Sequence, residues 1–158
     1  MKKQILVILT LLAGLQSVSL SQDLDAADRE PLEVVKEFLT AYMAKDHAKF
    51  ASYLDPNVVW IQPGDNRIAG VKRTKQELLQ MGAKMAELSA GTIRLVDVEY
   101  FSVNGNTVAC LLHWTGAQPP GGTLDVTNID IYTVEHGKIV MARIYSNDIE
   151  QEDRFWGK

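Results

Sequence analysis

The sequence predicts an α+β domain in which helices come first and pack on one face of a later antiparallel sheet. Apolar residues recur at helical spacing within 31–44 and 74–88, and from residue 92 onward they alternate with period two over long stretches. Asn104-Gly105 divides the first pair of these stretches, and this dipeptide is typical of two-residue β-hairpin turns. These observations indicate three helices followed by two long hairpins.

Each predicted helix has a start signal and an apolar stripe. Pro31 suits the first turn of a helix that runs to about Ala44. Asp46 is expected to cap a shorter second helix, and Thr74 with Glu77 forms a capping box for the third. The apolar stripes are Val35, Phe38, Leu39 and Tyr42 in the first helix, Phe50, Tyr53 and Leu54 in the second, and Leu78, Met81, Met85 and Leu88 in the third.

About five strands are expected from the alternating segments. A short one precedes the third helix, and four longer ones form the two hairpins. Their expected ranges are 58–62, 93–103, 107–115, 124–134 and 138–146. The acidic segment 147–152 is interpreted as solvated, and Phe155 and Trp156 as docking on the domain or on a partner subunit.

The first 21 residues have the features of a secretory signal peptide. Lys2 and Lys3 precede an apolar run over residues 5–15, and Ser19 and Ser21 provide the small residues of a cleavage site. We therefore expect cleavage near Ser21 and export to the periplasm or beyond, with no stable membrane anchor afterwards. The apolar run is shorter than the roughly 20 residues that a spanning helix needs, and an uncleaved tether is the alternative.

A single domain is expected over residues 31–158, after a flexible lead-in over 22–30. Without Lys2 and Lys3, 14 of the 16 basic residues remain against 20 acidic ones, a formal charge of −6. This balance argues against nucleic acid as a partner. Cys110 is the only cysteine, so no internal disulfide can form, and its apolar surroundings indicate a buried, inert thiol.

Metal and phosphate sites are not indicated by any spacing in the chain. No His-x-x-x-His, cysteine pair, phosphate-binding glycine loop or serine nucleophile elbow occurs. We therefore predict neither a metal nor a cofactor. His113 is expected on the outer face of the sheet at a dimer contact, and His47 and His136 are expected in solvent.

Asp130 lies in the middle of an apolar strand and is the most unusual feature of the sequence. An unpaired buried carboxylate is costly unless its pKa rises until the group is neutral. Three situations are open for Asp130. It faces solvent; it is a buried acid hydrogen-bonded to Asn128, Tyr132 or Trp60; or it lies in a cavity, where it carries a proton or anchors a ligand carbonyl or hydroxyl.

Five local motifs follow one another in a characteristic order. They are the opening helix 34–39, the segment 54–60, Ala69-Gly70, Trp114-Thr115-Gly116 and the hairpin 130–139. In this order and spacing they resemble the SnoaL-like polyketide cyclases of the nuclear transport factor 2-like superfamily. The resemblance extends over nearly the whole domain, and this fold hosts cyclases, isomerases, dehydratases, hydrolases and binding modules.

The resemblance implies a cone: a curved, mixed but largely antiparallel sheet with three N-terminal helices closing an inner pocket. It also implies a homodimer through the outer sheet face. Strand alternation and the apolar face of the first helix then give the expected pocket residues. These are Phe38, Tyr42, Trp60, Gln62, Leu112, Trp114, Asn128 and Tyr132.

The resemblance further implies that Asp130 is the catalytic acid, because cyclases and ketosteroid isomerases use a carboxylic acid at this strand position. Gln62 stands where the isomerases carry their base and Phe38 where they carry a tyrosine, so steroid isomerisation is not expected. We expect binding of a small, largely apolar molecule with a carbonyl or hydroxyl group, and cofactor-independent cyclase- or isomerase-type chemistry. The alternative is a non-catalytic extracytoplasmic ligand-binding or dimerisation module.

Overall fold

A six-stranded sheet forms the frame of the domain in the computed structural model, which describes residues 30–119 and 121–158. The spatial order is β2-β1-β6-β5-β4-β3. Neighbouring strands are antiparallel except for β1 and β6, which are parallel, so the sheet is mixed. The strands are β1 (Leu54–Gln62), β2 (Gly70–Lys72), β3 (Arg94–Asn104), β4 (Thr107–Gln118), β5 (Gly122–Glu135) and β6 (Lys138–Ser146).

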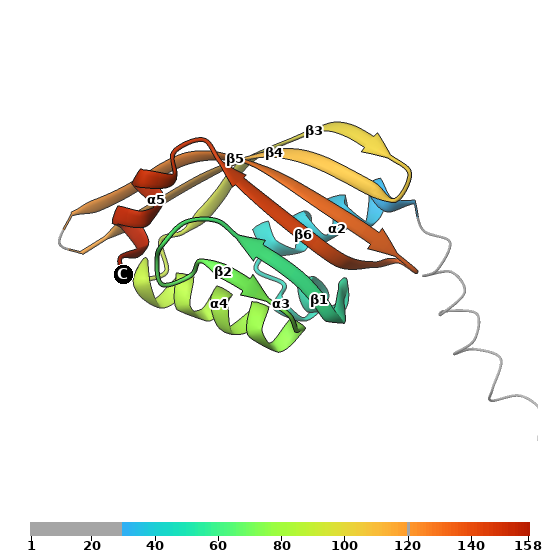
Figure 1. Ribbon diagram of the computed structural model, residues 1–158, viewed down its shortest axis with the longest axis horizontal. Coiled ribbons are helices and arrows are strands. Elements are labelled where there is room, and N and C mark those ends of the chain that lie inside the picture. The colour runs from blue at the N-terminus through green and yellow to red at the C-terminus, as the bar shows by residue number, and fades with distance from the viewer. Residues whose placement is uncertain (1–29, 120) are drawn as a thin grey trace, which may run out of the picture.

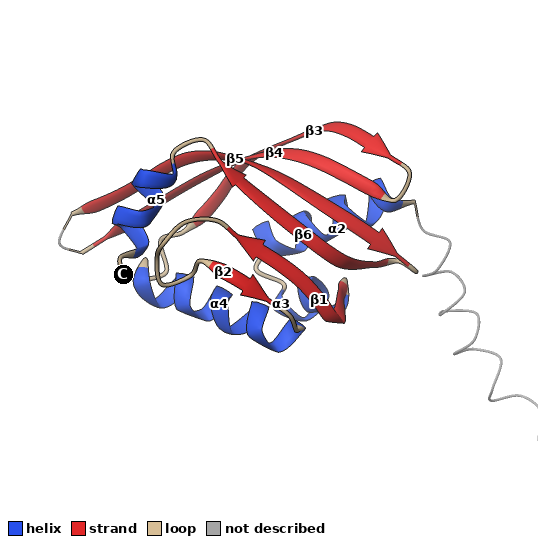
Figure 2. Cartoon of the chain, viewed as in Figure 1, coloured by secondary structure: helices blue, strands red, loops and turns tan. Residues whose placement is uncertain are grey.

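The described helices lie under the sheet and at one end of it (Figure 1). Figure 2 shows α2 and α4 beneath the curved strands, and α5 beside the end of the sheet where β5 begins. Asp46 caps α3 and Thr74 caps α4 through their side chains, as the sequence predicts. The helices are α2 (Pro31–Met43), α3 (His47–Ser52), α4 (Lys75–Leu88) and α5 (Ile149–Trp156).

The sheet curves because its ladder is interrupted at several points. The register shifts between Leu95 and Asp97 and again between Tyr100 and Ser102 in the β3–β4 pair, and between Thr133 and Val134 in the β5–β6 pair. Such shifts bend a strand and increase its twist. The result is an α+β cone whose concave face is covered by helices, which confirms the predicted fold class.

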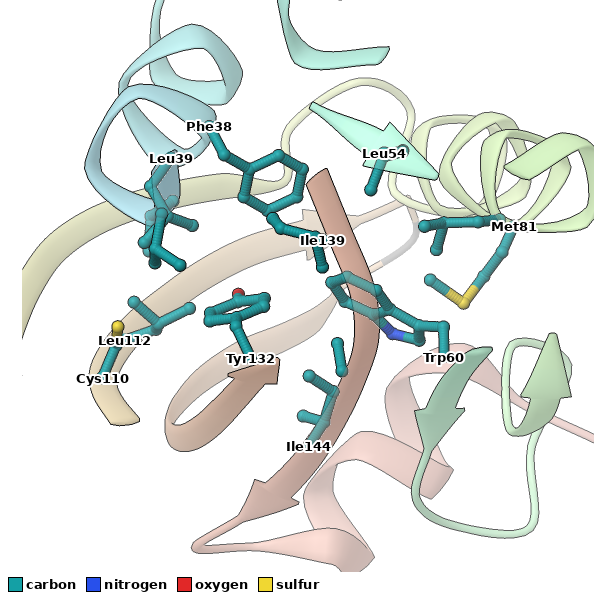
Figure 3. Packing of buried hydrophobic residues seen from close by; sticks show 14 of the residues in the cluster. Phe38, Leu39, Leu54, Trp60, Met81, Cys110, Leu112, Tyr132, Ile139 and Ile144 are labelled. Carbon is teal, nitrogen blue, oxygen red and sulfur yellow. The ribbon is translucent and has the colours of Figure 1, made fainter. Parts of the chain in front are cut away.

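The core occupies the concave face of the sheet, and strand alternation predicted it well. On β5 the inward side chains Asp130, Tyr132 and Val134 are 3%, 1% and 3% exposed. Figure 3 shows Phe38 from α2, Trp60 from β1 and Tyr132 from β5 converging on this interior. Burial of these large rings supplies much of the hydrophobic free energy that holds the helices to the sheet.

The predicted element list needs four corrections. The second helix ends at Ser52, and Leu54 already belongs to β1 rather than to a helix. β2 was not predicted, which makes six strands rather than about five. The three expected helices are present, but α4 follows β1 and β2, so they are not all N-terminal to the sheet. Finally, α5 replaces the solvated exit that was expected.

The predicted signal peptide over residues 1–21 and all but the last residue of the predicted lead-in over 22–30 lie outside the described residues. Cleavage near Ser21 and export therefore stay predictions. Within the described part of the chain, no helix is long and apolar enough to cross a membrane.

Candidate functional site

A cavity of about 500 Å³ opens between the concave face of the sheet and the helices. Its walls come from α2, α3 and α4 on one side, from β1, β3, β4, β5 and β6 on the other, and from α5 at one end. Most lining side chains are apolar or aromatic, which is the usual character of a small-molecule site. The expected site residues that line it are Phe38, Tyr42, Trp60, Gln62, Trp114, Asn128, Asp130 and Tyr132.

Leu112 is the expected pocket residue that does not line the cavity. Its side chain points inward from β4, as Figure 3 shows together with Cys110, but it is fully buried in the core. Strand alternation predicts the face that a side chain occupies and not whether other side chains cover it there.

Asp130 lies in this cavity on β5, which pairs with β4 on one side and with β6 on the other. The hydroxyl of Tyr132 donates a hydrogen bond of 2.7 Å to Oδ2. The other oxygen, Oδ1, has no hydrogen-bond partner among the described residues. Burial raises the pKa of Asp130 to about 7; the Tyr132 hydrogen bond opposes this rise, and the nearby carboxyl of Glu152 adds to it. Asp130 is therefore a neutral acid over much of the range below pH 7.

Glu152 is a second acid in the cavity, and the sequence analysis did not identify it. It lies on α5, which begins where the Asp148 side chain accepts a hydrogen bond of 2.9 Å from the Gln151 amide. The Glu152 residue is 2% exposed. With its amide oriented to satisfy its neighbours, Asn128 donates to Glu152 Oε1 at 3.2 Å.

The pKa of Glu152 is raised by burial, and hydrogen bonds from Ser146, Asn128 and Gln62 oppose that rise. One of these donors is itself fixed by an aromatic residue. The indole N–H of Trp60 donates to Gln62 Oε1 at 3.1 Å, so the amide nitrogen of Gln62 is left to face the carboxylate. Two buried acids thus occupy one cavity with different hydrogen-bond environments.

Aromatic side chains form the wall beside Asp130. The ring of Tyr132 meets the ring of Phe38 edge-on at a centroid distance of 5.8 Å, and it lies tilted against the ring of Trp60 at 6.0 Å. Further along the cavity, Tyr42 and Trp114 meet edge-on at 5.2 Å. These residues pack in the core and line the cavity at once, so they hold one another in place around it.

A family model for the SnoaL-like domain matches residues 35–154 of the chain, which is most of its length. The protein belongs to the SnoaL-like domain family. A comparison with curated proteins gave no match.

Solved structures share the fold of this SnoaL-like domain. A protein of unknown function with a cystatin-like fold from Xanthomonas campestris is 35% identical, with a TM-score of 0.77 over 82% of this chain and 100% of that one. A nuclear transport factor 2-like protein from Burkholderia xenovorans is 22% identical, with a TM-score of 0.65 over 80% of this chain and 95% of that one. TerC, co-crystallised with polyporic acid, is 16% identical, with a TM-score of 0.69 over 80% and 98% of the chains.

Other chemistry-bearing residues of this SnoaL-like domain lie apart from the two acids. His113 pairs with Asp125 at 2.6 Å on the outer sheet face, which agrees with its expected direction. Cys110 is fully buried, and burial raises the pKa of its thiol to about 12, so it stays protonated. In the described part of the chain, no group of three or more His, Cys, Asp or Glu side chains is arranged to hold a metal ion.

Glu152 left a recognisable signal in the sequence. Glu152, Phe155 and Trp156 have the i, i+3, i+4 spacing of one helix face, and Asp148 suits the N-cap position. The segment was interpreted as solvated because acidic residues dominate it. Helical spacing was the better guide, since all three residues are at most 3% exposed.

Proposed function

We propose that this SnoaL-like domain binds a small, largely apolar molecule with a carbonyl or hydroxyl group, and that Asp130 performs acid/base chemistry of the cyclase or isomerase type on it. The observation that carries this proposal is Asp130 Oδ1, an oxygen without a hydrogen-bond partner among the described residues, in a residue that lines the cavity. Buried polar atoms normally have partners, so a ligand oxygen is a suitable partner for this one.

The chemistry follows from the protonation state of Asp130. A neutral carboxyl group donates a hydrogen bond to a carbonyl oxygen and stabilises the negative charge that grows there when a neighbouring carbon loses a proton. Tyr132 donates to Oδ2 of Asp130 at 2.7 Å, so Oδ1 is the oxygen that has no partner within the described residues. Trp60, Gln62 and Trp114 then position the molecule against it.

The comparisons support a ligand pocket of this kind. TerC has the same fold and was crystallised with polyporic acid, which is an observation on TerC alone. The alternative function is a non-catalytic binding module that uses the same cavity without turnover. No observation of the cavity favours it over the acid/base function, because the unpaired oxygen of Asp130 serves either one.

Two aromatic probes distinguish these functions. 2-Naphthol, whose hydroxyl resembles an enol oxygen, tests binding by calorimetry. 2-Tetralone tests chemistry, because deuterium uptake from D₂O at its carbon 1 is followed by proton NMR. We expect Asp130→Asn to bind 2-naphthol about as well as the wild type, while the exchange rate falls by roughly 10²–10⁴-fold because an amide does not release its proton.

Asp125→Asn is the matched control, since Asp125 lies on the same strand with its side chain 76% exposed. It should leave both binding and exchange unchanged. Equal exchange in Asp130→Asn and the wild type would remove Asp130 from the chemistry. Binding of 2-naphthol by a wild type that catalyses no exchange at any pH would establish the binding module instead.

We also propose that the domain forms a homodimer through the outer face of its sheet. Ile129, Met141 and Tyr145 point outward from the adjacent strands β5 and β6 and are 40%, 42% and 48% exposed. Large apolar side chains that gather on one open face are typical of a subunit interface.

A further inference from the structure

We propose that Glu152 is the second proton-transfer residue of the pocket: its carboxylate removes a proton from the carbon next to the ligand carbonyl whose oxygen Asp130 binds. This inference rests on the proposed function and deepens it, because it names the base and the substrate class. It stands on the placement of two buried acids from different elements, β5 and α5, in one cavity.

The two acids lie near each other along the inner face of β5, so one ligand molecule can contact both. Asn128, which binds Glu152 Oε1 at 3.2 Å, is two residues from Asp130 on the same strand and the same face. Two residues of a strand extend about 7 Å, so Glu152 contacts β5 about one side chain along the inner face from Asp130. The carbonyl oxygen of a ketone and the C–H hydrogen beside it are a few ångströms apart, which is the scale of this separation along the strand.

Hydrogen bonding divides the roles of acid and base. Glu152 receives hydrogen bonds from Asn128, Gln62 and Ser146, which stabilise its charged form. Asp130 receives one hydrogen bond, from Tyr132, and its second oxygen is unpaired. Of the two acids, Glu152 is therefore the one whose charged carboxylate form is more stabilised, and Asp130 is the one more suited to donate a hydrogen bond in its neutral form. Environments that separate two acids in this way assign the base and the acid of a reaction.

The titratable groups around each acid agree with this division. Tyr132 and Cys110 face Asp130, and both stay protonated because their pKa values are raised. The carboxyl of Asp153 on the same helix adds to the rise of the pKa of Glu152, and the carboxyl of Glu152 adds to the rise of the pKa of Asp130. The basic lining residues Lys45 and Arg94 are exposed, at the edge of the cavity, and so is His47.

The step balances without a cofactor. The C–H bond breaks and its proton passes to the Glu152 carboxylate, while its electron pair forms the C=C bond of an enol. The carbonyl π pair moves to oxygen, which takes the Asp130 proton. When a C=C bond adjoins that carbon, the enol is a dienol: Glu152 returns its proton to the far carbon of the diene, the C=C bond moves into conjugation, and the oxygen returns its proton to Asp130 as the carbonyl re-forms, which isomerises the ligand. Alternatively, the enol carbon attacks a second carbonyl of the same molecule and closes a ring; the second carbonyl oxygen takes the Glu152 proton, and the first oxygen returns its proton to Asp130 as its carbonyl re-forms. The substrate class is therefore an aromatic or alicyclic ketone with an acidic C–H beside the carbonyl.

The test compares three variants of the same helix by the 2-tetralone exchange assay and 2-naphthol binding. Glu152→Gln keeps the hydrogen-bonding shape and removes the base, so we expect retained binding and a loss of exchange of about 10²–10⁴-fold. Glu152→Asp should recover part of the rate. Glu150→Gln is the matched control, because Glu150 lies on α5 with its side chain 88% exposed, and it should behave like the wild type.

The pH profile separates a catalytic role from a structural one. In the wild type the exchange rate should rise as Glu152 loses its proton and fall again as Asp130 ionises near pH 7, which gives a bell-shaped profile. Glu152→Gln should lose the rising limb while its folded state, checked by thermal unfolding, persists. Full exchange in Glu152→Gln together with loss in Asp130→Asn would overturn this inference and leave the proposed function intact. Absence of exchange in the wild type would overturn both.

Discussion

At the scale of single residues, the ionisation of Asp130 is the property with the clearest physical consequence. Its pKa is about 7 in the folded protein against an ordinary value of 3.8, because burial penalises the charged form. Between these two values the folded protein binds more protons than the unfolded chain. The contribution of Asp130 to stability therefore decreases as the pH rises from about 4 to about 7, and above that range the loss is complete.

We predict that Asp130→Asn removes this pH dependence. Relative to the variant, the wild type should lose roughly 2–3 kcal/mol of unfolding free energy between pH 5 and pH 8. Urea unfolding at both pH values measures this difference. Glu152 is present in both proteins, so its own titration largely cancels. Parallel stability curves for the two proteins would contradict the burial of an ionisable Asp130.

Residue-level prediction from the sequence succeeded where period-two alternation applied. The inward direction of Asp130, Asn128 and Tyr132 on one strand followed from one assumption about the face. The hydrogen bond between Tyr132 and Asp130 was among the expected alternatives and is present. The hydrogen bond between Asn128 and Glu152 was not predicted, because Glu152 lies on a different element, α5. Contacts between elements depend on packing angles that a single sequence does not contain.

At the scale of elements, the Phe155 side chain of α5 packs closely against the backbone of β4 at Gly116. A methyl group added at Gly116 of β4 would lie 3.1 Å from Cζ of Phe155 and 3.5 Å from Cδ1 of Ile93. Glycine in a strand often marks such an approach. The Trp114-Thr115-Gly116 motif thus has a structural reason, because its glycine provides the space for the helix that carries Glu152.

We predict that Gly116→Ala destabilises the domain by about 1–3 kcal/mol, because Phe155 has to shift to make room. Gly82→Ala is the matched control: Gly82 lies inside α4, and nothing lies within 4 Å of an added methyl group there. The control should stabilise the domain by about 0.5–1 kcal/mol, since alanine is the better helix former. Chemical unfolding measures both, and equal effects of the two substitutions would refute the tight docking of α5.

The elements that sequence analysis missed share a physical cause. β2 has three residues and α5 has eight, and so short a segment gives a weak periodic signal. The long strands and the helices α2 and α4 were predicted because their patterns repeat over many residues. The early start of β1 at Leu54 was missed because Pro56 suggested a break there. β1 pairs with β6 at Leu54 and next at Val59, so this proline lies where the ladder is interrupted.

At the scale of the whole molecule, the outer sheet face remains open in the single chain, while helices cover the concave face and enclose the cavity. The residues of the proposed homodimer interface, Ile129, Met141 and Tyr145, lie on this open face. Ile129 and Tyr145 are direct partners across β5 and β6, so they form one continuous patch.

We predict that Tyr145→Lys converts a dimer into a monomer, because an interface that is isologous places the new charge on both sides at once. Val71→Lys is the control, since Val71 is 46% exposed on β2, at the opposite edge of β1 from β6. Light scattering after size-exclusion chromatography gives the mass of each. A monomeric wild type, or a dimer that survives Tyr145→Lys, would contradict the proposed interface.

The two acids differ in how many neighbouring elements hold the element that carries each of them. β5 is bonded along its length to strands on both sides, whereas α5 is a single short helix at one end of the sheet. Mutational drift in the terminal helix can therefore replace one acid and leave the scaffold and the other acid unchanged. Substitutions on α5 therefore reach one acid of the proposed pair without altering the strand ladder that holds the other, and the same separation allows a designer to vary this helix on an unchanged cone.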